Sequence, residues 1–548
     1  MDRDRHDDVT SARDAVVAGR TTLGIELGST NIKACLVGPD SRTIAVGSFT
    51  WENQFVDRVW TYSLDAVHEG LRGAFAALAA DVRERYGVPL TAVGGLGVSA
   101  MMHGYLAFDA AGDLLVPFRT WRNTSTGQAA AELTRALEFN VPLRWSVAHL
   151  YQAMLDEEPH VPQVAFLTTL AGYVHWRLTG ERVLGVGDAS GMFPVDASTG
   201  DYDEARLAAF DALAAARGTA APARASLRAP LRALLPSVLP AGAAAGRLTP
   251  EGAALLDPTG TFAAGVPLCP PEGDAGTGMV ATNAVAPRTG NVSAGTSIFA
   301  MVVLEKALAA VHPEIDVVTT PSGDPVAMVH CNNGASELGA WAQVFEQFAR
   351  ALGVEAGQGA VFAALLGAAL DGDPDGGGLL AYNYLSGETI TGLDEGRPLL
   401  VRTPGSRLTL ANFARTQVCS VFATLALGMR TLAAEGVAVD ALLAHGGLFR
   451  TPGVAQRLLA AAVDAPVAVA ATAGEGGAWG VAVLAAYTAA VADGEERALA
   501  AWLDEHVFAD ALTVVARPEA ADVAGMGAYL ERYTAGLSIE HAAVAAIH

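Results

Sequence analysis

One pattern occurs twice in this chain: a short apolar strand, a turn of small residues and a second apolar strand. In the first copy, Thr22–Leu27 and Ile32–Val37 flank the turn Gly28-Ser29-Thr30. Residues 28–37 can be laid over residues 294–303 with Thr, Ile, Ala and Val in the same register. Such a match is weak by itself in a chain rich in alanine and valine. Together with the shared strand–turn–strand pattern, it favours a duplicated domain with a boundary near residues 280–290.

The residues after the first copy predict an α/β fold. A third strand is expected over Thr43–Phe49, and a helix is expected from Ser63 to Gly87 because apolar residues recur there every three or four positions. Ser63 is a suitable helix cap, and Gly87 is a suitable helix end. A buried strand is predicted over Val93–Ser99. Strands on both sides of a helix are typical of α/β domains.

Composition excludes several classes of protein. The 548 residues carry 35 Lys+Arg and 58 Asp+Glu, a net charge of −23, and 51% of them are hydrophobic. A chain with so large an apolar fraction is expected to fold, and its length predicts two to four domains. The acidic balance and the lack of a Lys/Arg run argue against a nucleic-acid partner. No uninterrupted apolar span of about 20 residues occurs, so no membrane segment is predicted.

Cysteine usage and the first residues give two further expectations. Cys35, Cys269, Cys331 and Cys419 are far apart, which makes a disulfide framework or a zinc site unexpected. We expect these four cysteines to be packing residues. Residues 1–20 are polar and lack the apolar core of a signal peptide, so they predict a short mobile tail on a cytoplasmic protein. The glycine- and aspartate-rich residues 371–378 predict a surface loop.

The two small-residue turns are candidate anion sites, because backbone N–H groups and hydroxyls in such turns can bind phosphate. An ordinary hairpin turn is the alternative for either one alone. No Gly-x-x-x-x-Gly-Lys-Ser/Thr motif occurs, which excludes a P-loop.

At the first turn, residues 24–33 (Gly-Ile-Glu-Leu-Gly-Ser-Thr-Asn-Ile-Lys) resemble the first phosphate motif of the FGGY carbohydrate kinases. Five more regions are similar to motifs of that family, in its order. These are residues 99–104 (Ser-Ala-Met-Met-His-Gly, as in xylulokinase-like members), 166–180 with 188–194 (the central region), 273–278 (the catalytic aspartate segment), 293–297 (the second phosphate motif), and 445–449 with 474–479 (the adenosine region).

The resemblance implies an α/β fold of two actin-like (ribonuclease H-like) ATPase domains with an interdomain cleft. It divides the chain into an N-terminal tail (1–20), a sugar-binding domain (21–284), a nucleotide-binding domain (285–492) and a helical extension (493–548). The implied activity is ATP-dependent phosphorylation of a sugar hydroxyl. The implied substrate is a ketopentose such as xylulose or ribulose, and the implied cofactors are ATP and Mg²⁺.

Three alternatives remain open at this point. They are a polyol kinase of the glycerol or erythritol type, an actin-like ATPase with no sugar substrate, and a relative that binds a sugar without phosphorylating it. The sequence does not specify the oligomeric state, for which a homodimer is one candidate.

Two carboxylates are the central candidates for chemistry. Asp274 precedes small residues that can start a helix, so it is either a helix cap or, by resemblance, the general base, and these two roles are compatible. Glu26 stands where the family has a magnesium-binding aspartate. Its extra methylene leaves the metal geometry open, and a charged residue on an edge strand is the alternative. The resemblance places both carboxylates, Glu26 and Asp274, at the metal.

The remaining site residues also follow from the resemblance. Met102, His103, Trp121, Arg122 and Asn123 are expected to bind the sugar with Asp274, although a lone histidine after an apolar strand is more often structural. The segment from Trp121 departs from the family pattern, which leaves the sugar open. ATP is expected to contact Gly28, Ser29, Thr30, Lys33, Gly295, Thr296, Gly446 and Gly447, and the last two admit a close approach of adenosine.

Overall fold

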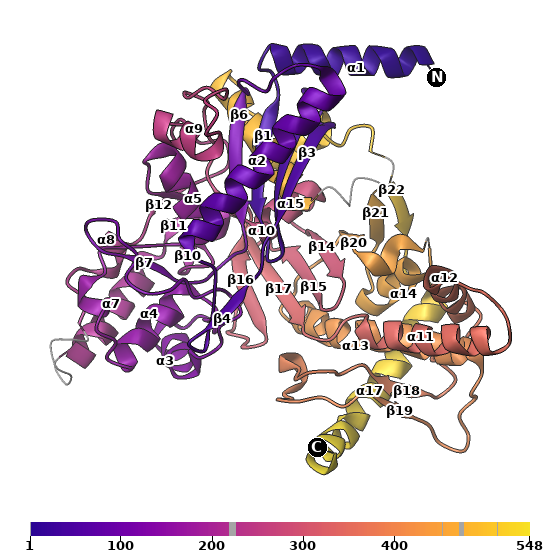
Figure 1. Cartoon of the computed structure of the whole chain (residues 1–548). Helices are drawn as coiled ribbons and strands as arrows, with labels where there is room; N and C mark the ends of the chain where they lie inside the picture. The colour runs from indigo at the N-terminus through magenta and orange to yellow at the C-terminus, as the bar shows by residue number, and fades with distance from the viewer. Residues whose placement is uncertain (1, 219–225, 452, 471–475, 512, 548) are drawn as a thin grey trace. The chain divides into compact units, whose positions relative to one another are not determined.

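The computed structural model describes residues 2–218, 226–451, 453–470, 476–511 and 513–547. The chain divides into two compact units, whose elements are labelled in Figure 1. The first unit comprises Met1–Val285, Val317–Pro325 and Glu475–Asp510, and the second comprises Ala286–Asp316, Val326–Gly474 and Ala511–His548. The predicted division at residue 284 is therefore crossed by two later segments that join the first unit. Residues 511–548 join the second unit instead of forming a separate extension.

The core of the first unit is a mixed five-stranded sheet in the order β13-β6-β1-β2-β3. Its strands are β1 (Thr22–Leu27), β2 (Asn31–Val37), β3 (Thr43–Thr50), β6 (Gly95–Ala100) and β13 (Glu272–Gly273). The first three strands are antiparallel, whereas β6 and β13 are added in parallel to β1. The predicted strands over 22–27, 32–37 and 43–49 are confirmed to within a residue. The fourth begins at Gly95 rather than Val93.

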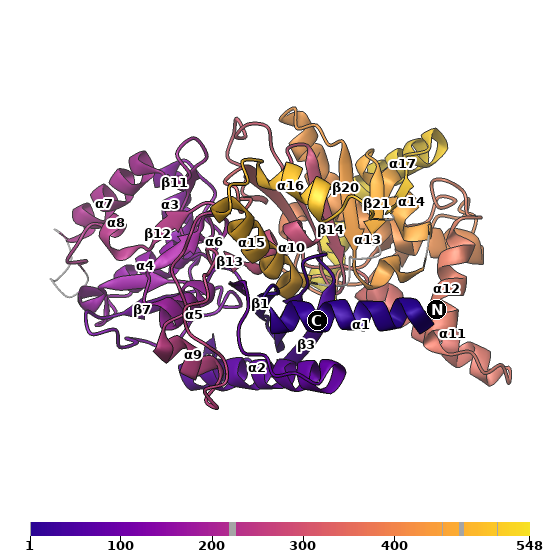
Figure 2. The ribbon, with the colours of Figure 1, turned by 90° about the horizontal axis from the view of Figure 1, so that it is seen from above.

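Two long helices cover the two faces of this sheet (Figures 1 and 2). Helix α2 (Leu64–Tyr86) packs on β2 and β3, and α15 (Gly476–Ala492) packs on β1 and β6. The ends of α2 are as predicted, because Ser63 accepts a hydrogen bond from the N–H of Ala66 and Gly87 adopts φ 68°. Gly24 of β1 admits α15, since a Cβ there would lie 1.9 Å from the carbonyl oxygen of Ala478.

The predicted N-terminal tail is helical. Residues Asp2–Val17 form helix α1, and Ala15 and Val16 are only 3% and 2% exposed. Two apolar side chains near the end of the helix thus pack into the first unit, which a composition dominated by charge does not reveal.

The other elements of the first unit are short helices and two-stranded sheets. The helices are α3 (Gly127–Leu137), α4 (Ser146–Leu155), α5 (Leu170–Thr179), α6 (Val186–Ala189), α7 (Glu204–Gly218), α8 (Leu231–Leu234), α9 (Pro250–Leu256), α10 (Asp274–Ala281) and α16 (Leu499–His506). The strand pairs are β4 (Gln54–Val56) with β5 (Val59–Thr61), β7 (Leu106–Phe108) with β8 (Phe166–Thr168), β9 (Val183–Gly185) with β12 (Ser237–Leu239), and β10 (Val195–Asp196) with β11 (Asp201–Tyr202).

The sheet of the second unit repeats the topology of the first. Its strand order is β16-β17-β15-β14-β20-β21-β22. The strands are β14 (Thr289–Ala294), β15 (Ile298–Val303), β16 (Ile315–Thr319), β17 (Pro325–Cys331), β20 (Ala441–His445), β21 (Val467–Ala470) and β22 (Thr513–Ala516). Strands β17, β15 and β14 are antiparallel, and β20 and β21 continue in parallel. This is the arrangement of β3-β2-β1-β6-β13, so the strand–turn–strand repeat marks equivalent positions in the two sheets.

Helix α13 (Leu410–Ala434) is the central helix of the second unit. Around it are α11 (Ser336–Ala351), α12 (Gln358–Ala369), α14 (Val454–Val463), α17 (Ala520–Ala546) and the pair β18 (Leu380–Tyr382) and β19 (Leu399–Val401). Among the described residues α13 alone is long and apolar enough to cross a membrane, and 72% of its apolar window is buried within the protein. A core helix meets the same criteria, and the cytoplasmic location stays a prediction.

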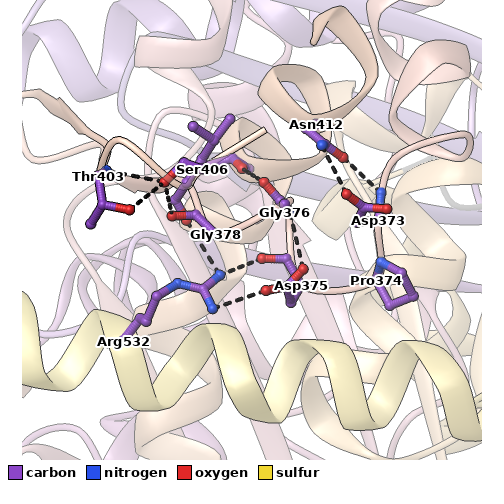
Figure 3. Close-up of polar contacts among 12 residues, drawn as sticks. Asp373, Pro374, Asp375, Gly376, Gly378, Thr403, Ser406, Asn412 and Arg532 are labelled. Carbon is purple, nitrogen blue, oxygen red and sulfur yellow. Dashed lines mark hydrogen bonds and ion pairs between the residues drawn. The ribbon is translucent and has the colours of Figure 1, made fainter. Parts of the chain in front are cut away.

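The glycine- and aspartate-rich residues 371–378 form a loop that α17 holds in place (Figure 3). Arg532 of α17 donates to the carboxylate of Asp375 at 3.0 Å and also to its carbonyl oxygen. On the other side, the amide of Asn412 donates to Asp373 at 3.0 Å and accepts from its N–H at 2.7 Å. The predicted loop is confirmed, and side chains from α13 and α17 fix its shape.

Candidate active site

Three parallel strands of the first unit bring the predicted catalytic residues to one edge of the sheet. Glu26 lies near the carboxyl end of β1, His103 follows β6, and Asp274 follows β13. The register pairs Leu27 with Ala100 and Ala100 with Gly273, so the three strands end side by side. The carboxyl ends of parallel strands are the usual place for ligands in α/β sheets.

Asp274 is the first residue of α10, and Gly273 occupies the cap position, so the helix-cap alternative is not what the structure shows. Its Oδ1 accepts a hydrogen bond from the N–H of Met102 at 3.2 Å. The surrounding protein atoms and the charge of Glu26 raise the pKa of Asp274 to about 6, against hydrogen bonds that lower it. The side chain still has an exposed face, where water screens its charge.

Three neighbours surround the carboxylate of Glu26, namely a lysine side chain, a backbone N–H group and a glycine. Lys33 pairs with it across β2, and the N–H of Ala478 at the start of α15 donates to its carboxylate. A Cβ on Gly477 would lie 2.5 Å from Oε1, so the glycine lets α15 begin beside the carboxylate. Burial raises the pKa of Glu26, and the charge of Lys33 opposes that effect. By resemblance, residues 474–479 are expected in the adenosine region. Within that segment Gly474 and Glu475 lie outside the described residues, and Gly477 lies beside Glu26.

The donor set of Glu26 and Asp274 fits magnesium. Glu26 raises the pKa of Asp274 by its charge, a repulsion that a divalent cation would relieve. No group of three or more His, Cys, Asp or Glu side chains within the described residues is arranged to hold a metal ion. Two carboxylates are nonetheless enough for Mg²⁺, which keeps several waters and takes further oxygens from phosphate.

His103 is held in an unusual backbone conformation, with φ 67°, and is 5% exposed. Its Nδ1 lies 3.1 Å from the carbonyl oxygen of Gly191, so Nδ1 must carry the proton that is donated. Burial, helped by the charge of Arg144, lowers the pKa of His103 to about 3. The ring is therefore neutral, and its Nε2 is an acceptor suited to a hydroxyl. Met102, before it, is 7% exposed and holds Asp274 through its backbone.

The segment 121–123 divides between exposed and structural residues. Trp121 is 41% exposed and its Nε1 donates to Ser29 Oγ at 3.3 Å, which links it to the first turn. The Arg122 guanidinium stacks on Trp60, 4.0 Å from the ring centroid. Asn123 is 7% exposed, and its amide bonds to the backbone of Trp60 at 2.8 and 2.9 Å. The amide of Asn123 thus holds the chain in this structure, and a contact of Asn123 with a sugar stays a prediction.

The first turn is fastened through its carbonyl groups. Trp51 Nε1 donates to the carbonyl oxygen of Gly28 at 2.8 Å, and the Tyr62 hydroxyl donates to that of Ser29 at 2.6 Å. The rings of Trp51 and Tyr62 stack with centroids 4.0 Å apart. Thr30 and Lys33 are exposed beyond this support. The backbone of the turn is thus fixed while its polar groups remain available.

In the second unit the four predicted nucleotide residues meet at one sheet edge. Gly295 and Thr296 follow β14, and Gly446 and Gly447 follow β20, its parallel neighbour. All four residues are exposed. Gly446 has φ 111°, and a Cβ there would lie 2.3 Å from the carbonyl oxygen of Ala294, so only glycine fits. This edge is the counterpart of the edge that carries Glu26 and the first turn in the first unit.

Two buried residues that the sequence does not single out, Glu272 and Asn333, support these edges. In the first unit, Glu272, two residues before Asp274, accepts hydrogen bonds from the N–H groups of Gly187 and Asp188 at 3.2 and 2.9 Å. Burial raises the pKa of Asp188 to about 7, and Thr169 donates to its Oδ2 at 2.5 Å. The one sequence signal that indicates a role for Glu272 is its charge, which stands between the uncharged residues Pro271 and Gly273.

In the second unit, the missed residue is Asn333. Its Oδ1 accepts from the N–H groups of Leu385 and Ser386 at 2.8 and 3.0 Å, and its amide donates to Glu388 at 3.2 Å. The next residue, Gly334, donates to the carbonyl oxygen of Thr296 at 2.7 Å. Asn333 therefore fixes the backbone next to Gly334, and Gly334 in turn holds the second turn at Thr296. No local sequence pattern indicates these contacts.

Comparison with known proteins identifies the family. Residues 21–280 match the N-terminal domain of the FGGY family of carbohydrate kinases, and residues 290–489 match its C-terminal domain. This chain belongs to the FGGY family. The predicted fold of two actin-like, ribonuclease H-like ATPase domains and the predicted class of phosphotransferase are thereby confirmed, and FGGY kinases use ATP as the phosphate donor.

Solved structures share the fold of this FGGY chain at low sequence identity. A xylulose kinase from Rhodospirillum rubrum is 20% identical with a TM-score of 0.75, over 95% of this chain and 99% of the other. A gluconate kinase from Lactobacillus acidophilus is 16% identical with a TM-score of 0.72, over 96% and 98%. The glycerol kinase of Plasmodium falciparum, solved with ADP, is 11% identical with a TM-score of 0.69, over 94% and 98%. At these identities the likeness is one of fold.

Proposed function

We propose that this FGGY kinase transfers the γ-phosphoryl group of MgATP to a hydroxyl of a ketopentose such as xylulose or ribulose. The observation that carries the proposal is the grouping of Asp274, neutral His103 and Glu26 at the ends of three adjacent parallel strands. A carboxylate base and a neutral acceptor within one edge suit a polyhydroxy substrate.

In this proposal Asp274 takes the proton from the attacking hydroxyl. The upward shift of its pKa makes it a better base than a free aspartate, while it remains ionised at neutral pH. The Nε2 atom of His103 would accept a hydrogen bond from a second hydroxyl. The carbonyl oxygen of Gly191 holds the ring in place through Nδ1. Trp121 offers an exposed apolar face for the carbon skeleton.

Glu26 and Asp274 are the residues that would hold magnesium, which neutralises phosphate charge when bound. Gly28, Ser29, Thr30 and Lys33 in the first unit, and Gly295 and Thr296 in the second, would contact the phosphates. Gly446 and Gly447 would approach the adenosine. The interdomain cleft and a homodimer stay predictions.

The test is a panel of ketoses and polyols in a coupled ATP-turnover assay, with detection of the phosphorylated product. We expect magnesium-dependent turnover that a ketopentose stimulates many-fold. A larger stimulation by glycerol or erythritol would instead establish a polyol kinase. Equal ATP hydrolysis with and without every sugar would contradict the proposal and favour the ATPase alternative.

Glu26 has its own test within this proposal. Glu26→Gln should raise the magnesium concentration needed for half-maximal turnover and lower the maximal rate, because it removes one of two anionic ligands. The matched control is Glu69→Gln, an exposed carboxylate of the same unit. Wild-type magnesium dependence in Glu26→Gln would assign this glutamate a structural role.

A further inference from the structure

A cavity of about 400 Å³ lies in the first unit, away from Glu26 and Asp274, between α1 and the turn that joins β2 to β3. Its walls include Val9, Ala12, Ala15, Pro39, Ile44 and Tyr86. This volume is in the range of small-molecule sites, which are mostly apolar with a few polar groups. Helix α1 precedes residues 21–280, the segment that matches the family, and so adds a wall of its own.

The charged groups of the cavity favour an anion. Arg20, Arg42 and Asp40 contribute to its lining. Arg42 lies 3.6 Å from Asp40, so these two charges offset one another. Arg20 is exposed, and within the part of the chain that the structure describes no carboxylate pairs with it. Its backbone N–H donates to the carbonyl oxygen of Ala15 at 3.0 Å, which fixes the main chain of Arg20 beside the cavity. One positive charge beside an apolar wall suits an organic anion.

A short path connects this cavity with Glu26. Ser41, at the tip of the β2–β3 turn, accepts a hydrogen bond through its carbonyl oxygen from Trp479 Nε1 at 2.9 Å. Trp479 is 3% exposed in α15, and its neighbour Ala478 donates its N–H to Glu26. A ligand that moves the turn therefore acts on the residue next to a donor of Glu26. Both contacts come from the first turn of α15, so the turn and Glu26 are joined through two adjacent residues of one rigid element.

We propose that this cavity binds a small organic anion with an apolar body, and that its occupancy alters the position of Glu26 through Trp479. The binding half of the proposal is independent of the proposed function, whereas the regulatory half rests on it.

Anilinonaphthalene sulfonate (ANS), which has a flat apolar body and one sulfonate, is the probe for binding. We expect saturable ANS fluorescence with ADP present to occupy the nucleotide site. Arg20→Glu should weaken ANS binding at least about tenfold, because a charge-assisted contact is lost. Ala12→Trp should abolish it by filling the cavity. Arg13→Glu, on the same helix but outside the lining, should stay within about twofold of wild type, since a remote exposed charge contributes little.

Two results would overturn the site. Unchanged ANS affinity in both Arg20→Glu and Ala12→Trp would place the dye elsewhere. An equal loss in Arg13→Glu and Arg20→Glu would mean nonspecific attraction. Arg20 is exposed, so its variant tests the site even if Ala12→Trp unfolds α1.

The regulatory half is tested by the magnesium dependence of sugar-stimulated turnover. Saturating ANS should change the half-saturating magnesium concentration at least about fivefold in the wild type, a typical size for coupling between sites. Trp479→Phe keeps an aromatic ring but removes the N–H that donates to Ser41. This variant should bind ANS normally, and ANS should leave its magnesium dependence unchanged. An unchanged magnesium dependence in the wild type rejects the coupling, and an effect that persists in Trp479→Phe rejects the path. If no sugar supports turnover, the proposed function fails while the fluorescence result still decides the site.

Discussion

Asp274 shows how the place of a residue on a helix separates two interpretations of one sequence pattern. The structure gives the cap position to Gly273 and makes Asp274 the first residue of α10. Burial and the charge of Glu26 raise the pKa of the Asp274 carboxyl, and hydrogen bonds from the N–H groups of Met102, Ala275 and Asp274 itself lower it. The carboxylate therefore braces the start of α10 while its net upward pKa shift suits a base.

Asp274→Asn should therefore cut sugar phosphorylation at least about 100-fold, the usual contribution of a general base. Melting temperature and ATP affinity should stay near wild type, because asparagine keeps the shape and can still accept from Met102. The matched control is Glu251→Gln, another acidic residue in a first helical turn. A rate within about threefold of wild type would contradict the assignment, given the size expected for a lost base.

Gly446 and Gly447 are adjacent residues that should differ in their tolerance of a larger side chain. Gly446→Ala places a Cβ against the Ala294 carbonyl at a positive φ, whereas Gly447 has nothing within 4 Å of a Cβ. Strain of about 1–3 kcal/mol should lower the melting temperature of Gly446→Ala by about 2–12 °C. Gly447→Ala should melt close to wild type. Equal melting temperatures for the two variants, measured by calorimetry, would mean that the β14–β20 edge adapts.

At the scale of elements, α17 is joined to α13 and α14 by a buried ion network. Asp522 accepts from Arg415 and from Arg457, each at 2.5 Å, and Asp522 and Arg415 are both 2% exposed. Asp522→Ala leaves the Arg415 guanidinium buried without its partner, which should cost about 3–5 kcal/mol, or about 6–20 °C in melting temperature.

The control for Asp522 is Glu519→Ala at the start of the same helix. Glu519 pairs with Arg457 at 3.0 Å, but it is 57% exposed, so about 1 kcal/mol or less is expected. Replacing both Asp522 and Arg415 by Leu and Met should restore much of the loss, because no charge is then left buried. A fall in Asp522→Ala no larger than that in Glu519→Ala would show that α17 is held by its apolar face instead.

Elements differ in how far the sequence specifies them. Helix α2 and strands β1 to β3 follow from local periodicity and turn residues, and the ordered motifs indicate the family and Asp274. The placement of α15 on β1 depends instead on contacts between residues more than 400 positions apart, such as Trp479 with Ser41. The structural use of Asn123 depends likewise on the backbone of Trp60, which no pattern near residue 123 reveals.

For the whole molecule, buried ionisable groups predict a dependence of stability on pH. Burial raises the pKa of Asp188 and of Glu388 to about 7 in the folded state, above ordinary values of 3.8 and 4.5. Their contribution to stability is fully present below about pH 4 and is lost as the pH rises toward 7, because in this range the unfolded chain has released protons that the folded state still holds. The double variant Asp188→Asn with Glu388→Gln should gain melting temperature relative to wild type between pH 4 and 7.

A buried histidine provides a control of opposite sign. Burial lowers the pKa of His149 to about 3 from 6.5, so its contribution is present above pH 6.5 and is lost as the pH falls. His149→Gln should gain melting temperature relative to wild type as the pH is lowered from 6.5. Melting curves of the variants that run parallel to wild type across this range would show that these groups are solvated.

The origin of α15 near the end of the chain affects how the protein is made. When the ribosome has synthesised the chain as far as Val285, the first unit still lacks α15, the helix that covers β1 and β6. This is because α15 ends only at Ala492. At cellular rates of elongation, the 492 − 285 = 207 intervening residues require about 10–40 s. For that interval the nascent sheet has an uncovered apolar face, so translation speed and chaperones bear on the yield of folded kinase.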